Sequence, residues 1–353
     1  MKPGLNPSSK QISGGGPILI YLLVFCGMFF SEGVIFNVKL IQTLWIKQPL
    51  LVLPGILGTH VAYGIMLIYC FDLVLRHGFQ SFKGIYLTGC IYGLINEGIF
   101  ADLIFKPGFL PSSIGLSVDR LLFPALSWHP LLDFVLVWWM VNRLLSGRLG
   151  LERKIPSLKG IFFMGFFCLY WHLWSHSLIL KNLLPDGILP EIRVLWILYP
   201  ICTLAVLLAL MNGKSFVLKP ILTHRVRLGM TLLLGLLFIL RAVMIASPIP
   251  LLSFLLILFL VWISSTQYQE GVPLKIESSP LAISRSNLAL SSFFILVFMT
   301  FLSLNCSSGK WLFVWEKLGA ILILMWLIIS AVLFLFVLLM SLKKWLQSRL
   351  LSP

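Results

Sequence analysis

The sequence predicts an all-α membrane protein, built as a polytopic transmembrane helical bundle. Of its 353 residues, 59% are hydrophobic and only 11% are charged, whereas ordinary soluble domains carry about 25% charged residues. Apolar runs of roughly 18 residues or more recur along the whole chain, and this length crosses a bilayer as a helix. A soluble fold does not fit this composition.

About ten spans are expected. Pro54 and Gly55 favour a kink in the second span, and Pro124 and Pro130 interrupt the fourth, which could begin as a separate half-helix. The spans lie near 17–36, 49–75, 84–106, 121–145, 158–181, 194–212, 228–248, 250–267, 287–305 and 317–342.

The distribution of Lys and Arg predicts the topology. Loops on one side of the membrane hold eighteen basic residues and loops on the other side hold eight, while Arg241 lies within a span. Because cytoplasmic loops carry the excess of basic residues, both termini are expected in the cytoplasm, which requires an even number of spans. The expected location is the cell membrane of a bacterium or archaeon, as a multi-pass protein.

Four segments are expected along the chain. Residues 1–16 are rich in Gly, Pro and Ser and predict a disordered tail. Residues 17–193 form a transmembrane half that contains every acidic residue found within a span, and residues 194–342 form an apolar transmembrane half. Residues 343–353 form a cytoplasmic tail.

Several functional classes are excluded by pattern. The net charge is +15, but the basic residues lie in short loops without interleaved aromatics, which argues against a nucleic-acid partner. The six cysteines occur singly, so neither a disulfide framework nor a zinc ribbon is indicated. The bilayer is the expected partner.

Five acidic side chains fall within the predicted spans. An ionisable group in a membrane costs roughly 2.5–3.5 kcal/mol on insertion, so each needs a partner or a polar cavity. Asp72 precedes Arg76 by one helical turn, and we interpret this pair as structural. The five acids are Glu32, Asp72, Glu97, Asp102 and Asp133.

A polar site is predicted from spacing and depth. His129 and Asp133 share one helix face, as do His172 and His176. A rise of about 1.5 Å per residue places all four, with Glu97, between the middle of the membrane and its outer face. We therefore predict one site, open to the non-cytoplasmic side, formed by Glu97, His129, Asp133, His172 and His176.

The residue types of this site suit metal-assisted chemistry. Imidazole and carboxylate groups bind zinc and related divalent ions, so His129, His172 and His176 are candidate metal ligands. Glu97 and Asp133 are candidate catalytic residues, with Glu97 as general base. An activated water could then attack an ester or amide of a lipid-like substrate, which predicts a hydrolase or transferase.

Other interpretations of the same residues stay open. His172 and His176 could pack among neighbouring tryptophans, and His129 could cap a helix. Glu97 and Asp102 are five residues apart, about 140° around a helix, so both face one site only if the helix distorts at Gly98. We expect Glu97 to point inward and Asp102 to lie at the aqueous rim.

Three further residues of the spans have their own alternatives. Arg241 could neutralise an acid across the bundle or extend toward the membrane surface. His60 fits a packing role, and Glu32 fits an interfacial position near the outer end of its span. None of the three is counted among the site residues.

Two functions compete with an enzyme. A series of Glu, Asp and His residues within a membrane could carry protons in a proton- or ion-coupled transporter. The absence of a visible half-to-half inverted repeat argues against this class. The polar residues could instead bind partners in a non-catalytic subunit or assembly factor of a membrane complex.

Overall fold

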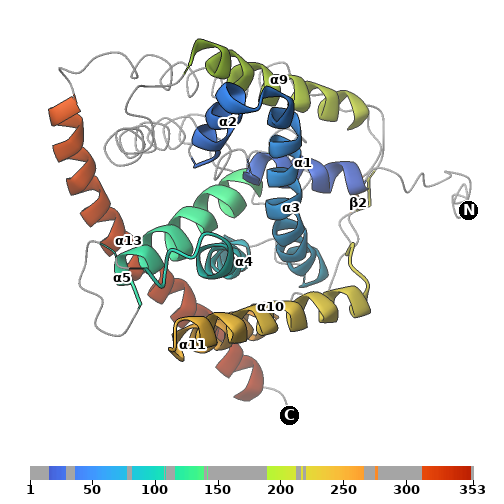
Figure 1. Cartoon of the computed structure of the whole chain (residues 1–353). Coiled ribbons are helices and arrows are strands. Elements are labelled where there is room, and N and C mark those ends of the chain that lie inside the picture. The colour runs from blue at the N-terminus through green and yellow to red at the C-terminus, as the bar shows by residue number, and fades with distance from the viewer. Residues whose placement is uncertain are drawn as a thin grey trace, which may run out of the picture.

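The computed structural model describes residues 16–28, 36–77, 82–106, 108, 116–138, 141, 189–211, 216–217, 220–265, 275–276 and 312–350. The described part is all-α apart from one two-residue antiparallel pairing, β1 (Phe216–Val217) with β2 (Lys275–Ile276). Its α-helices are α1 (Gly16–Met28), α2 (Phe36–Lys47), α3 (Val52–His77), α4 (Phe82–Ile95), α5 (Val118–Arg120), α9 (Pro190–Met211), α10 (His224–Met244), α11 (Ile249–Ser265) and α13 (Leu312–Leu350) (Figure 1).

Three helices of the described part are long and apolar enough to cross a membrane, which indicates an integral membrane protein. They cover Pro49–Arg76, His224–Met244 and Leu324–Gln347. Two shorter apolar helices cover Ile18–Met28 and Ile249–Ile263. The spans expected near 158–181 and 287–305 lie outside the described residues, so the number ten stays a prediction.

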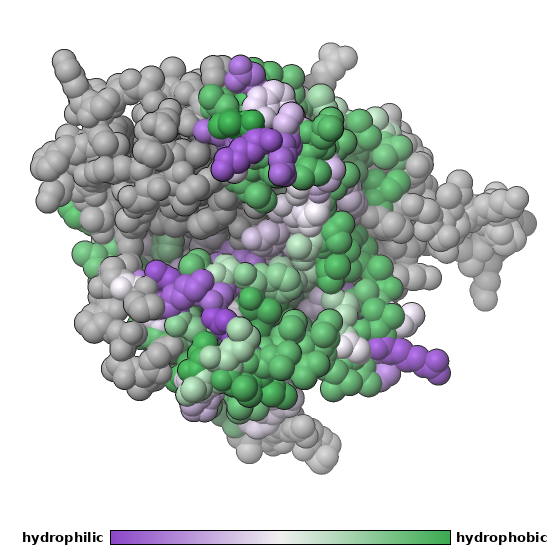
Figure 2. All heavy atoms as spheres, viewed as in Figure 1, coloured by the Kyte–Doolittle hydropathy of each residue, from purple (hydrophilic) through white to green (hydrophobic). Residues whose placement is uncertain are grey.

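The outer faces of these helices are apolar, as lipid contact requires. Val243 and Met244 of α10 are about three-quarters exposed, at 74% and 75%. Ile328 and Leu339 of α13 are similarly unburied. Figure 2 shows the result as a broad hydrophobic surface interrupted by small hydrophilic patches. Exposed apolar area on this scale is unfavourable in water and is satisfied by a bilayer.

The helix α4 forms the centre of the fold. Figure 1 shows it almost along its axis, with α3 beside it and α10 and α11 below. Contacts join α4 to α3 and α11, and every residue of α4 from Gly84 to Ile95 is buried. Its interior position explains why it is apolar on all sides.

Three π-helical segments follow α4 in the chain. They are η4 (Asn96–Phe100), η5 (Leu121–Trp128) and η6 (Pro130–Leu136). Proline lacks an amide donor and ends or distorts a regular helix. The expected half-helix at Pro124 and Pro130 does not form. Because His129 between η5 and η6 has helical dihedrals, the chain continues through both prolines in wider turns.

Two glycines let α4 approach η5 and η6 closely. A Cβ atom on Gly93 would overlap the carbonyl oxygen of Ala125, and one on Gly89 would overlap the Cα atom of Pro130. Both obstacles are backbone atoms, which cannot rotate away as a side chain can. The sequence Gly89-x-x-x-Gly93 therefore sets the separation between α4 and the segment that carries His129.

The predicted pair of Asp72 and Arg76 is confirmed, at 3.3 Å. Asp72 also accepts hydrogen bonds from the amides of Ile221 (2.6 Å) and Leu222 (2.9 Å), and Arg76 donates to the Leu222 carbonyl at 2.6 Å. These bonds attach the chain before α10 to the end of α3. The pair is structural, as the sequence indicates.

The chain between the first two expected spans is helical rather than a simple loop. It contains α2 and the short 3-10 turn η3 (Pro49–Leu51). Trp45, Ile46 and Leu50 are exposed there beside the basic Lys47. Aromatic, aliphatic and basic side chains of this kind are typical of a helix at a membrane surface.

Replacing Gly93 tests the close approach between α4 and η5. Gly93→Ala should destabilise the protein by about 1–3 kcal/mol, because the new methyl group meets backbone and the helices must separate. Thermal unfolding in detergent would measure the loss.

Gly58→Ala in α3 is the matched control, because nothing lies within 4 Å of a Cβ atom there. That change should be neutral or stabilising by about 0.5–1 kcal/mol, since alanine favours a helix over glycine. Equal melting temperatures for the two variants would contradict the packing described here.

Candidate functional site

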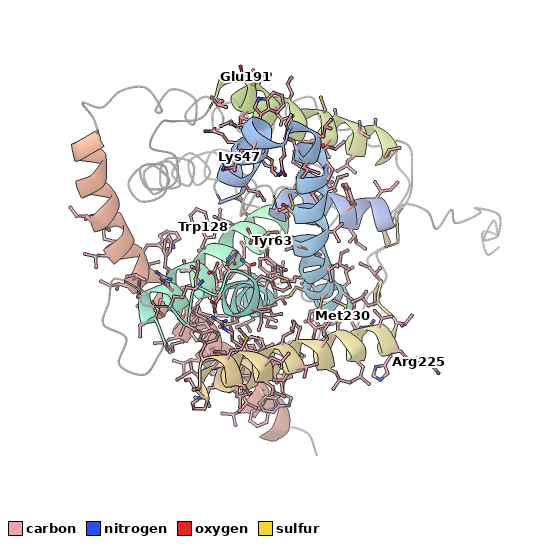
Figure 3. The ribbon with its side chains drawn as sticks, in the orientation of Figure 1. Lys47, Tyr63, Trp128, Glu191, Arg225 and Met230 are labelled. Atoms are coloured by element: carbon pink, nitrogen blue, oxygen red, sulfur yellow. The ribbon has the colours of Figure 1, made fainter. Side chains whose placement is uncertain are left out.

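His129 lies between two carboxylates. Its Nε2 atom is 2.7 Å from Oε1 of Glu97, and its Nδ1 atom is 2.7 Å from Oδ2 of Asp133. Glu97 belongs to η4 and Asp133 to η6, so the imidazole links the segment after α4 to the neighbouring π-helical segment. Figure 3 labels Trp128, the residue before His129, in this part of the molecule.

The three side chains are almost completely buried. His129 is 2% exposed, Glu97 4% and Asp133 0%. An isolated charge at such a depth is very costly, and its cost falls only when a partner of opposite charge or a hydrogen bond is provided. The pairing of one imidazole with two carboxylates supplies both, and it leaves a net charge of −1 on the three groups if all are ionised.

Asn96 is a fourth member, which the sequence pattern did not predict. Its Nδ2 atom lies 3.1 Å from Nε2 of His129 and 3.5 Å from Oε1 of Glu97. Consecutive residues point about 100° apart on a regular helix, so Asn96 and Glu97 are not expected to meet one side chain. The π-helical turn Asn96–Phe100 widens the helix at this point. Such turns frequently occur at functional sites.

The contact between Nε2 of His129 and Oε1 of Glu97 is compatible with a proton on either of the two atoms. With the proton on His129, the ring donates to both carboxylates. With the proton on Glu97, the single lone pair of Nε2 accepts a hydrogen bond either from Glu97 or from the Asn96 amide. Asp133 fixes the ring in both states through Nδ1. The three side chains therefore form one buried hydrogen-bonded chain in which Asp133 orients the ring.

The second oxygen of Glu97 is available for another group. Among the described residues, Oε2 of Glu97 has no hydrogen-bond partner although it is buried. The hydroxyl of Ser127, two residues before His129 in the chain, is also buried without a hydrogen-bond partner among the described residues. Buried polar atoms are nearly always satisfied by protein, water or ligand. Oε2 is therefore the oxygen of Glu97 that the described contacts with His129 and Asn96 leave unused.

Tyr92 completes one wall of the site. Its ring stands edge-on to the imidazole of His129, with centroids 5.2 Å apart and an interplanar angle of 87°. It also packs against Phe134 at 5.5 Å. Tyr92, near the end of α4, lies four residues before Asn96, the first residue of η4, and this spacing is the sequence signal that identifies both as site neighbours.

Asp102 is separate from this group, as its expected place at the rim implies. It pairs with Lys106 at 3.2 Å and with Arg241. Its φ angle is +54°, a left-handed conformation that turns the chain away from the helix after η4. Of the two alternatives for Arg241, neutralisation of an acid across the bundle is the one observed.

The remaining candidates do not join the described contacts of the site. His60 bonds the carbonyl of Ile56 in its own helix at 2.8 Å and stacks on Phe25. His172, His176 and Glu32 lie outside the described residues. Within the residues that the structure describes, no group of three His, Cys, Asp or Glu side chains is placed to hold a metal ion. The ligand set of His129, His172 and His176 stays a prediction.

Comparison with protein-family models, with curated proteins and with solved structures finds no match for this chain. A function is therefore inferred from the residues of the site and their geometry. The contacts that support the inference are the two 2.7 Å hydrogen bonds of His129.

Removing the imidazole tests whether it stabilises the two buried carboxylates. His129→Leu should cost about 3–5 kcal/mol of stability, because Glu97 and Asp133 then stay buried without a cationic partner. His60→Leu is the matched control and should cost far less, since His60 bonds a carbonyl of its own helix. Chemical unfolding in mixed micelles would measure both, and similar losses would contradict the assigned pairing.

Proposed function

We propose that this protein is an integral membrane enzyme that uses Glu97, His129 and Asp133 for acid–base catalysis on a lipid-like substrate. The observation that carries the proposal is the buried hydrogen-bonded chain from Glu97 through His129 to Asp133. A carboxylate with one oxygen bonded to an imidazole and the other available can accept a proton and pass it on. The reaction is hydrolysis, or group transfer when another nucleophile replaces water.

The proposed hydrolysis begins with a water hydrogen-bonded to Oε2 of Glu97. As the water oxygen forms a bond to the carbonyl carbon of an ester or amide, its proton moves to Glu97. Glu97 then donates this proton to the leaving oxygen or nitrogen as the bond between that atom and the carbonyl carbon breaks, which restores the Glu97 carboxylate. Asp133 takes no proton; it holds the ring and stabilises its charged form, as the third member of a catalytic triad does.

A metal-dependent form of this enzyme is a second version of the proposal. A carboxylate on one ring nitrogen commonly orients a histidine whose other nitrogen binds a metal, and Asp133 at Nδ1 has this position. A metal at Nε2 would displace Oε1 of Glu97 from its 2.7 Å contact. His172 and His176 would complete the ligand set, with zinc as the favoured ion.

The proposal includes a topology. We propose ten spans with both termini in the cytoplasm, an orientation that the eighteen-to-eight distribution of basic residues supports, and we propose the cell membrane of a bacterium or archaeon as the location. In this orientation the site opens to the non-cytoplasmic side. The polar half of the bundle, residues 17–193, then holds the catalytic groups, and residues 194–342 supply apolar spans around them.

The buried hydrogen-bonded chain also supports a proton-coupled transporter as a second candidate. The same three side chains could load and release a proton while the protein changes conformation. Proton-dependent flux in liposomes would favour this function. Stable co-purification with other membrane proteins would instead favour a non-catalytic subunit.

Oxygen-18 labelling tests hydrolysis on a mixture of candidate substrates. The purified protein is incubated in vesicles of total membrane lipid and protein extract in H₂¹⁸O, and products that gain ¹⁸O are identified by mass spectrometry. We expect labelled products with the wild type and at least about a hundredfold fewer with Glu97→Gln, because general base catalysis contributes about 10²–10⁴-fold.

Glu191→Gln is the control variant, because Glu191 is exposed on α9 and lies outside the proposed site. Equal labelling by the wild type and by Glu97→Gln would contradict the proposal. Repeating the labelling with a metal chelator distinguishes the two versions of the proposal. Loss of labelling that zinc restores indicates the metal-dependent form, whereas unchanged labelling indicates direct acid–base catalysis.

A further inference from the structure

The loop that follows η4 gathers three basic side chains. Lys106 Nζ lies 3.2 Å from Oδ2 of Asp102, and Arg241 reaches the other oxygen of the same carboxylate from α10. Arg120, at the end of α5, donates to the carbonyl of Leu103 at 3.3 Å. We call Lys106, Arg120 and Arg241 the cationic rim. The three residues come from three separate segments and meet at one short loop.

The charges at the rim do not cancel. Asp102 is shared by two cations, and Asp119, beside Arg120 in the chain, is buried and accepts a hydrogen bond from Ser117 at 2.8 Å. Three basic groups therefore stand against two carboxylates. A hydrophilic patch is visible on the side of the molecule where α5 lies (Figure 2).

Arg241 has donor capacity that its described contacts do not use. Its side chain is 21% exposed, and its Nε atom is buried with no hydrogen-bond partner among the described residues. A guanidinium carries five donors in a planar fork that matches phosphate and carboxylate oxygens. An arginine within the apolar helix α10 is costly, so a further anionic partner would stabilise it.

The rim is attached to the backbone of the proposed catalytic residues. The carbonyl of Glu97 accepts hydrogen bonds from the amides of Leu103 (2.8 Å) and Ile104 (3.3 Å), and the carbonyl of Asn96 accepts one from Ala101 (2.8 Å). Phe238, one turn before Arg241 on α10, packs at Gly98 within η4. A ligand held at the rim is therefore positioned next to the segment that carries Glu97.

We propose that the cationic rim binds the anionic headgroup of a phosphate-bearing lipid, and that this lipid belongs to the substrate class of the site. The second clause rests on the proposed enzymatic function, while binding itself does not. A guanidinium and an ammonium converging on one place bind phosphate through charge-assisted hydrogen bonds. The surrounding exposed aliphatic residues of α10, such as Leu240 and Val243, suit the acyl chains.

Lipid retention measured by native mass spectrometry tests the binding. The protein is equilibrated in detergent with equal amounts of phosphatidylglycerol and phosphatidylcholine, and the retained lipids are counted. We expect the wild type to prefer phosphatidylglycerol and Arg241→Gln to lose that preference by about tenfold, the effect of removing one charge-assisted contact. The proposal would be overturned if Arg241→Gln preferred phosphatidylglycerol over phosphatidylcholine as strongly as the wild type does.

Two further variants keep the result interpretable. Arg225→Gln is the matched control, since Arg225 is an exposed arginine at the opposite end of α10; it should leave the preference unchanged. Arg241→Lys keeps the charge and should retain most of the preference. If Arg241→Gln does not fold, the double change Lys106→Gln with Arg120→Gln replaces it, and an unchanged preference there overturns the proposal equally.

Two more measurements are needed. One distinguishes a lipid headgroup from free phosphate as the ligand, and the other distinguishes a failure of lipid binding from a failure of the proposed enzymatic function. Inorganic phosphate should not displace phosphatidylglycerol at millimolar concentration; full displacement would show a site for a soluble anion and would overturn the lipid assignment. Glu97→Gln should keep the lipid preference while losing ¹⁸O incorporation. If the wild type incorporates ¹⁸O but shows no preference for phosphatidylglycerol, only the proposal that the cationic rim binds lipid is refuted. If the wild type prefers phosphatidylglycerol but its ¹⁸O labelling does not depend on Glu97, only the proposed enzymatic function is refuted.

Discussion

The hydrogen-bonded placement of His129 between Glu97 and Asp133 is the interaction on which the rest of the site depends. Two carboxylates without this imidazole would be too costly to keep at their depth. The imidazole reaches both only because α4 and the η5–η6 segment lie in close contact. Gly89 and Gly93 permit that contact by leaving no Cβ atoms between the two backbones. The two glycines therefore determine the helix packing, and the helix packing determines whether His129 reaches both carboxylates.

The π-helical turns serve the same interaction. A regular helix would direct Asn96 and Glu97 to different sides, whereas η4 brings both to His129. Prolines at positions 124 and 130 prevent a regular helix from forming around His129, and the chain adopts wider turns there. Irregular backbone is tolerated in a membrane protein when other parts of the protein surround it, and here the neighbouring α4 is buried from Gly84 to Ile95.

The sequence was informative wherever the determining contact is local. Apolar runs located the helices α3, α9, α10, α11 and α13. Spacing of four residues identified Asp72 with Arg76 and His129 with Asp133, and both contacts are present. The depth of Glu97 in its predicted span indicates a position level with His129 and Asp133. Each inference required only helical periodicity and the cost of a charge in the membrane.

Contacts between distant segments could not be deduced in this way. The pairing of Asp102 with Arg241 joins residues far apart in the chain, and periodicity alone does not say which helices are neighbours. Asn96 was missed because its role depends on a π-turn rather than on spacing. The helix α2 was missed because its amphipathic pattern is short. The contributions of His172 and His176 remain a prediction, because these residues lie outside the described part of the chain.

The most direct test of the central claim is the separation of Glu97 and His129 in a bilayer. Solid-state NMR with ¹³C-labelled glutamate and ¹⁵N-labelled histidine measures the dipolar coupling between the Glu97 carboxyl carbon and Nε2 of His129, with Glu97→Gln used to assign the signal. A 2.7 Å hydrogen bond from Oε1 to Nε2 places the carbon and nitrogen about 3.5 Å apart and predicts a strong coupling. The absence of any coupling between the two labels would contradict the account.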